Sequence, residues 1–122
     1  MANNDSLINL RELQKKVIAF RDERNWKQFH TLKNLLIALN IECAELQELF
    51  LWDKDEDIIN NLDEPKRKKV AEEIGDIFIY LLYLSDYFKL NLIQAAFDKL
   101  EINRKKYPVS KSYNSSKKYD SL

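Results

Sequence analysis

The chain has very few of the residues that break helices and build tight turns. Its 122 residues include one glycine, Gly75, and two prolines, Pro65 and Pro108. Folds rich in β-strands need many turns, which glycine and proline commonly supply, so this scarcity predicts an all-α protein. The single cysteine, Cys43, excludes an internal disulfide and a zinc site built from cysteines, and it is typical of a reducing compartment.

Long apolar runs and an excess of one charge are also absent. The longest apolar run, residues 77–84, is far shorter than the roughly 20 residues of a membrane span. The polar start, residues 1–5, lacks the pattern of a secretion signal, so we expect a cytoplasmic protein with no membrane partner. Twenty basic residues balance twenty acidic ones. This balance argues against a general attraction to a nucleic-acid polymer.

What the sequence does contain is helical periodicity, in a chain long enough for one domain with 45% apolar residues. We predict a single all-α domain over residues 1–108, folded as a bundle of four to five helices, and a polar tail with little regular structure over 109–122. Helices are expected near residues 6–22, 32–51, 63–88 and 91–107, with N-caps at Ser6, Thr31, Asp63 and Asn91.

Two connectors are expected between these helices. Residues 25–30 mix aromatic and polar side chains without a period, which indicates a loop or short turn. The acidic stretch after Trp52 predicts a second connector, with a short helix at 58–62. The run 77–84 is apolar on all sides of its helix, so we also expect an extensive subunit interface and a homodimer or homotetramer.

Two pairs of acidic residues occur at a spacing of three residues: Glu42 with Glu45, and Glu73 with Asp76. Members of each pair share a helix face, and Glu42 and Glu73 fall among apolar residues on that face. Two such helices packed together bring four carboxylates into one small space. Buried anions need a counter-charge, and an all-oxygen ligand set favours a hard cation such as Mg²⁺, with Mn²⁺ as an alternative.

Three other interpretations compete with a magnesium site. In a chain with 33% charged residues, such pairs also arise by chance on solvated helix faces. A carboxylate-bridged iron or manganese bundle would require Glu-x-x-His on two helices, and His30, the one histidine, does not follow a glutamate at that spacing. A non-catalytic helical oligomerisation or adaptor module could instead pair these acids with lysines and arginine of a neighbouring subunit.

Three stretches of the chain resemble a known family. They are residues 20–30, residues 34–52 with Glu42-x-x-Glu45, and residues 72–81 with Glu73 and Asp76. They resemble the MazG-like nucleoside triphosphate pyrophosphohydrolases, and within that family the small dCTP pyrophosphatase type. Residues 99–108 are similar to the end of the family's C-terminal helix.

The resemblance implies an all-α, Mg²⁺-dependent enzyme, usually a dimer of dimers. Such an enzyme cleaves a nucleoside triphosphate between the α- and β-phosphates, releasing a nucleoside monophosphate and pyrophosphate. The acids Glu42, Glu45, Glu73 and Asp76 match the family's metal-binding positions. Positions that surround the base, sugar or phosphates in the similar enzymes are matched by Trp26, His30, Trp52, Tyr80, Lys99 and Asn103.

Further roles follow from the chemistry that this reaction needs. Glu42, Glu45, Glu48 and Glu72 are candidate catalytic acids, of which Glu48 or Glu72 could accept the proton of the attacking water or orient that water. Arg104, like Lys99, could bind the β- and γ-phosphates through charge-assisted hydrogen bonds, although a cation in a last helical turn also needs no ligand. Gly75 costs about 1 kcal/mol relative to Ala in a helix, so we expect a close approach of another backbone or a ligand there, or simple helix packing.

Overall fold

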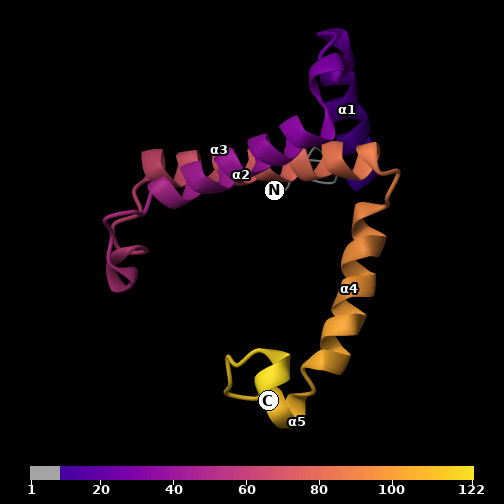
Figure 1. Ribbon diagram of the computed structural model, residues 1–122. Coiled ribbons are helices and arrows are strands. Elements are labelled where there is room, and N and C mark those ends of the chain that lie inside the picture. Colours follow the sequence, from indigo (N-terminus) through magenta and orange to yellow (C-terminus); the bar gives the residue numbers. More distant parts are fainter. Residues whose placement is uncertain (1–8) are drawn as a thin grey trace. The chain divides into compact units, whose positions relative to one another are not determined.

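The computed structural model describes residues 9–122, which are largely helical and contain no strand (Figure 1). The all-α prediction is therefore confirmed. The chain divides into two compact units, Met1–Phe88 and Lys89–Leu122. The helices of the first unit are α1 (Leu10–Glu23), η2 (Lys27–Phe29), α2 (Leu32–Glu48), η3 (Asp55–Asp57) and α3 (Glu64–Tyr87). The second unit contains α4 (Leu92–Lys106), α5 (Val109–Ser112) and η4 (Tyr119–Ser121).

Side-chain caps start three helices where the sequence predicts them. The side-chain oxygens of Thr31, Asp63 and Asn91 each accept a hydrogen bond from the backbone N–H three residues on, at 3.2, 2.9 and 2.9 Å. The predicted cap Ser6 lies outside the described residues. The structure begins α1 at Leu10, with Asn9 accepting the N–H of Glu12 at 2.9 Å. Each cap satisfies a backbone donor that has no partner inside the helix.

Other boundaries differ from the prediction by a turn or less. α2 ends at Glu48 and α3 at Tyr87, while α4 ends at Lys106, before Pro108, as expected. The second connector carries its short helix at Asp55–Asp57, not at 58–62. Lys66 Nζ lies 2.7 Å from Asp53 Oδ2 and fastens this connector to the first turns of α3. Residues 109–122 contain the short helical segments α5 and η4, and the predicted domain boundary at residue 108 stays a prediction.

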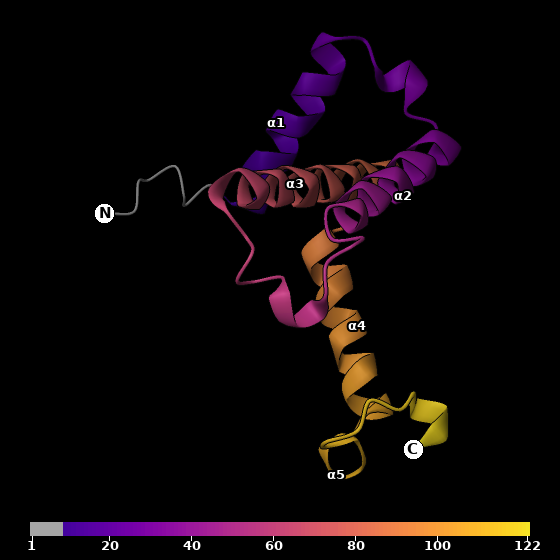
Figure 2. The same cartoon turned by 90° about the vertical axis from the view of Figure 1, so that its left-hand side faces the viewer.

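The first unit is built on α2 and α3, which lie side by side as a hairpin, with α1 crossing α3 (Figure 2). Its core holds four buried apolar side chains: Val17, Leu35, Leu82 and Tyr83. The Tyr83 hydroxyl donates to the Val17 carbonyl at 3.0 Å, and the Gln14 amide donates to Ser85 Oγ at 3.0 Å. These bonds join α1 to α3, and the bond from Tyr83 is buried, where a lost hydrogen bond is costly.

A buried arginine completes the contact between α1 and α3. The side chain of Arg21 is only 7% exposed, and its Nε and Nη1 atoms lie 2.9 and 3.3 Å from carboxylates of Asp22 and Asp86. Burial alone would lower the pKa of Arg21, but its hydrogen bonds to Asp22 and Asp86 leave that pKa raised. The guanidinium thus stays charged and is neutralised from both helices.

Much of the apolar surface of α2 and α3 remains exposed within the described chain. The exposed side chains include Leu36, Ile37, Ile41, Ile74 and Phe78. A Cβ atom added at Gly75 would meet nothing within 4 Å, so the expected close approach is not made within the described chain. No described helix is long and apolar enough to cross a membrane.

Candidate active site

Three of the four predicted acidic ligands converge between α2 and α3. Glu42 on α2 and Glu73 and Asp76 on α3 each place one carboxylate oxygen within 4.8 Å of the others. The spacing of three residues puts Glu73 and Asp76 on one face of α3, and the hairpin turns this face toward Glu42. Glu45 is not part of this group of three; it is exposed on α2, one turn beyond Glu42, and its carboxyl group still acts on that of Glu42.

The three carboxylates lack a counter-charge within the described chain. Glu42 Oε2 and Glu73 Oε2 are buried without a hydrogen-bond partner, and none of the ion pairs among residues 9–122 includes Glu42, Glu73 or Asp76. The pKa of Glu42 is raised to about 7, mainly by burial and then by the neighbouring carboxyls of Glu73, Asp76 and Glu45. Oxygen atoms that are buried, clustered and unpaired are a suitable ligand set for a divalent cation.

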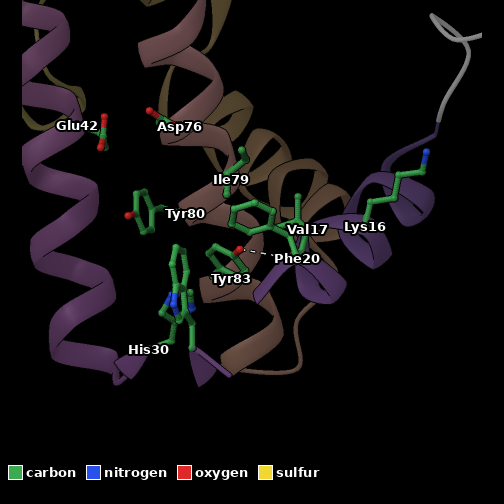
Figure 3. Close-up of a pocket in the computed structure, with 10 residues that line it drawn as sticks. Lys16, Val17, Phe20, His30, Glu42, Asp76, Ile79, Tyr80 and Tyr83 are labelled. Carbon is green, nitrogen blue, oxygen red and sulfur yellow. Dashed lines mark hydrogen bonds between the residues drawn. The ribbon is translucent and has the colours of Figure 1, made fainter. Parts of the chain in front are cut away.

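The acidic cluster opens into a cavity of about 480 Å³ lined mainly by aromatic and apolar side chains. Figure 3 shows Glu42 and Asp76 facing each other across the space between α2 and α3, with Tyr80 beside them. Burial and the charges of Glu42, Asp76 and Glu45 raise the pKa of Tyr80, which therefore stays protonated and able to donate a hydrogen bond. An aromatic-lined cavity beside carboxylates that can hold a divalent cation suits a ligand with an aromatic ring and an anionic group.

His30 forms another part of the cavity wall. Its ring packs edge-on against Tyr83, with centroids 4.6 Å apart, and Tyr83 packs in turn against Tyr80 at 6.2 Å. The Nδ1 atom of His30 is buried without a partner. Burial, and then the charge of Arg21, lower the pKa of His30, so the imidazole is neutral at neutral pH. A neutral imidazole can both donate and accept a hydrogen bond.

Of the remaining predicted site residues, some line the cavity and others lie on exposed surfaces or in the second unit. Trp26 lines the cavity and is 43% exposed. Trp52 does not line it and is 91% exposed on the connector after α2. Glu48 and Glu72 are exposed on α2 and α3. The predicted phosphate and base contacts on α4, which belongs to the second unit, are Lys99, Asn103 and Arg104.

The cavity also has lining residues that the sequence did not single out as part of a site. They are Lys16, Val17, Phe20, Ile79 and Tyr83. Val17 and Phe20 belong to the apolar stripe of α1, and Ile79 and Tyr83 belong to the apolar run of α3, so periodicity alone assigns all four to the core. One feature of the sequence could have indicated a cavity here: several aromatic residues follow closely after the acidic pair on α3.

Comparison with known proteins gives concordant results. A family model described as the MazG-like family matches residues 37–122. The chain is 40% identical to dCTP pyrophosphatase 1 of Bos taurus and 38% identical to that of Homo sapiens, over 93% of this chain and 68% and 67% of those proteins. The crystal structure of a pyrophosphatase from Archaeoglobus fulgidus superimposes with a TM-score of 0.76 at 42% identity, covering 81% of this chain and 92% of the other.

The helical fold, the carboxylate cluster and these similarities define an enzyme, a nucleotide pyrophosphohydrolase. The chain belongs to the MazG-like family.

Proposed function

We propose that this enzyme hydrolyses dCTP, or a dCTP with a modified base, between the α- and β-phosphates. The products are the nucleoside monophosphate and pyrophosphate, so the enzyme removes unwanted nucleotides from the cellular pool. The observation that carries the proposal is the cluster of Glu42, Glu73 and Asp76 at an aromatic-lined cavity. The choice of cytosine follows the names of the mammalian relatives.

We assign the metal site to Glu42, Glu45, Glu73 and Asp76. Glu45 adds a fourth carboxylate, and its charge already acts on Glu42. Their oxygen ligands suit Mg²⁺, with Mn²⁺ as a substitute. When bound, such an ion neutralises phosphate charge and makes a water more acidic.

The reaction itself transfers the nucleotidyl group, the nucleoside with its α-phosphate, to water. A water oxygen bonds to the α-phosphorus, the bond from that phosphorus to the bridging oxygen breaks, and pyrophosphate leaves. Glu42, Glu45, Glu48 and Glu72 are the candidate acids for orienting the water. Glu48 and Glu72 are exposed, so either carboxylate can accept the water's proton and pass it to solvent.

The nucleoside is assigned to the aromatic cavity of the first unit. Trp26 and Tyr80 offer flat surfaces for the base, and the neutral His30 offers a hydrogen-bonding edge. Trp52, Lys99 and Asn103 are assigned to base and phosphate binding by family resemblance, and Arg104 is assigned to phosphate binding by its charge. Two of these carry a positive charge, which suits contacts with phosphate.

We also propose that the enzyme works in the cytoplasm as a homodimer or homotetramer. The lone cysteine is consistent with a reducing compartment. Beside the exposed apolar side chains of α2 and α3 lies a groove of about 620 Å³. Its lining is mainly apolar and includes Leu46, Phe50, Val70 and Ile74. Exposed apolar surface of this kind commonly marks a subunit interface.

A substrate panel tests the reaction. The purified chain is incubated with the common NTPs and dNTPs plus Mg²⁺, and pyrophosphate and orthophosphate are measured separately. We expect pyrophosphate from dCTP. Glu42→Gln and Asp76→Asn should each lower kcat at least about 100-fold with the helical circular dichroism retained, whereas the exposed Glu12→Gln should have little effect. Orthophosphate alone, or no product from any nucleotide, would refute the proposal.

A further inference from the structure

Arg21 is the one charged residue that is buried in the described part of the chain. Its ion pairs with Asp22 and Asp86 explain how the guanidinium keeps its charge, but not why it lies inside the protein. An ion pair taken out of water loses hydration, and the attraction between its members offsets that loss only in part. A buried cation beside the cavity therefore needs a reason other than stability.

The backbone of Arg21 fixes the loop that carries Trp26. α1 ends at Glu23, and Asn25 then adopts a φ of 54°, a left-handed conformation that asparagine tolerates better than most residues. The chain turns back, and the Trp26 N–H donates to the Arg21 carbonyl at 3.0 Å. Trp26 packs edge-on against Phe20, and both rings line the cavity. One wall of the cavity is thus held at Arg21.

The side chain of Arg21 reaches a second wall of the same cavity. Its bond to Asp86 attaches it to α3, and its guanidinium carbon lies 6.0 Å from the centroid of the Tyr83 ring. The Tyr83 ring packs edge-on against His30 at 4.6 Å, and the two side chains lie next to each other in Figure 3. The same residue therefore contacts both aromatic walls, one through its backbone and one through its guanidinium.

The charge of Arg21 also acts on His30. The titratable and charged side chains that line the cavity with His30 come from three helices; they are Lys16 on α1, Glu42 on α2, and Asp76, Tyr80 and Tyr83 on α3. Burial raises the pKa of both tyrosines, which stay neutral. Burial, and then the positive charge of Arg21, lower the pKa of the imidazole. A nearby cation opposes protonation of His30, so that one ring nitrogen remains an acceptor.

We propose that Arg21 is a positioning residue for the nucleoside, because one buried cation holds two walls of the cavity in place. One wall is Trp26 with Phe20, and the other is Tyr83 with His30. Arg21 does not itself line the cavity, so it acts through these side chains. Arginine suits this role because its planar guanidinium directs several N–H donors at two carboxylates at once. The inference rests on the proposed function in taking a nucleoside as the ligand of the cavity.

The first test follows His30, the one histidine of the chain, whose imidazole signal is read directly by NMR. The full chain is titrated with acid in EDTA, without nucleotide. In Arg21→Gln the pKa of His30 should rise toward its ordinary value of 6.5 and stop short of it, because burial remains. Arg21→Lys keeps the positive charge and should leave this pKa close to that of the wild type. Arg11→Gln is the matched control, because Arg11 is exposed on the same helix, and it should change nothing.

The second test separates binding from chemistry in the proposed reaction. In Arg21→Gln the KM for dCTP should rise at least about fivefold while kcat stays within about twofold of the wild type, because the nucleoside walls loosen and the carboxylates are unchanged. Arg21→Lys should give an intermediate KM, since an ammonium group lacks the fork that bonds both carboxylates. Arg11→Gln should keep the wild-type KM and kcat.

Two results would overturn the role of Arg21. One is a His30 titration that is the same in the wild type and Arg21→Gln, or that Arg11→Gln shifts equally. The other is a loss of kcat in Arg21→Gln with KM unchanged. If Arg21→Gln loses helical circular dichroism, Arg21→Met combined with Asp86→Asn takes its place, because it removes both charges of the pair and should raise the His30 pKa in the same direction. A wild type that hydrolyses no nucleotide would refute the proposed function, whereas the His30 titration decides the role of Arg21 without any nucleotide.

Discussion

Among the carboxyl groups of residues 9–122, that of Glu42 is the one at which burial and neighbouring charge oppose ionisation most strongly. Its pKa of about 7 in the folded chain lies above the ordinary value of 4.5. Between these two pH values the folded state binds more protons at this group than the unfolded state does. The free energy of unfolding of the metal-free protein should therefore contain a contribution from Glu42 that is present at low pH and lost as pH rises toward 7.

The direction of this pH dependence of stability can be checked by thermal melts in EDTA from pH 4.5 to 8. Relative to Glu42→Gln, the wild-type Tm should fall as pH rises, because only the wild type has a carboxyl to ionise at this position. Mg²⁺ should raise the wild-type Tm more at pH 8 than at pH 5, since the ligand binds the ionised cluster. An identical pH dependence of Tm in the wild type and Glu42→Gln would contradict the assignment.

The sequence predicted much of the acidic cluster, but less of the cavity around it. Two pairs at a spacing of three residues were enough to select Glu42, Glu73 and Asp76, because helical periodicity fixes which side chains share a face. Which carboxylates meet across the hairpin depends on the register of α2 against α3, and so the exposure of Glu45 outside the group of three was not predictable. Val17 and Tyr83 line the cavity and are also buried, a double role that an apolar pattern cannot reveal.

At the scale of the elements, the attachment of α1 to α3 rests on a small number of buried polar contacts. The Tyr83 hydroxyl is the donor to the Val17 carbonyl, and the Arg21 guanidinium lies about 6.0 Å from the centroid of the Tyr83 ring. Because His30 packs on the same ring, this contact also fixes part of the cavity wall. The position of α1 is thereby coupled to the shape of the proposed nucleoside site.

Replacing one hydroxyl tests this attachment. Tyr83→Phe should lower the free energy of unfolding by about 1 kcal/mol, because it removes a buried hydrogen bond and leaves the Val17 carbonyl without that donor. Tyr87→Phe is the matched control on the same helix, where the side chain is 49% exposed, and we expect almost no change. Chemical denaturation of both variants gives the comparison, and equal stability losses would show that the buried bond contributes nothing specific.

Helix starts were predicted better than the ends and connectors. Thr31, Asp63 and Asn91 carry oxygen atoms suited to capping, and this chemistry is local enough to read from the sequence. The connector after α2 is different, since its short helix and the pairing of Lys66 with Asp53 depend on where α3 begins in space. Contacts between residues distant in sequence are not encoded in a local pattern.

At the scale of the whole molecule, the proposed association of subunits depends on the apolar surface of α2 and α3. Ile74, which is 51% exposed and borders the apolar groove, is the most direct position to probe. Ile74→Glu would place a charge in the proposed interface and should shift the protein toward the monomer. Sedimentation velocity over a range of protein concentrations measures this shift.

The connector residue Ile59 provides the comparison for that experiment. It is 79% exposed, so Ile59→Glu makes the same chemical change at a position outside the groove. We expect Ile59→Glu to sediment like the wild type. A wild-type protein that stays monomeric at every concentration, or equal dissociation of both variants, would exclude the interface at Ile74.

The unequal exposure of the two tryptophans gives the molecule a built-in optical probe. Trp52 is 91% exposed, whereas Trp26 is 43% exposed and packs edge-on against Phe20 with centroids 5.7 Å apart. A collisional quencher such as acrylamide should therefore reach the indole of Trp52 far more readily than that of Trp26. Any ligand or neighbouring subunit that covers the connector would protect Trp52 from quenching, and this fluorescence change would be visible without a label.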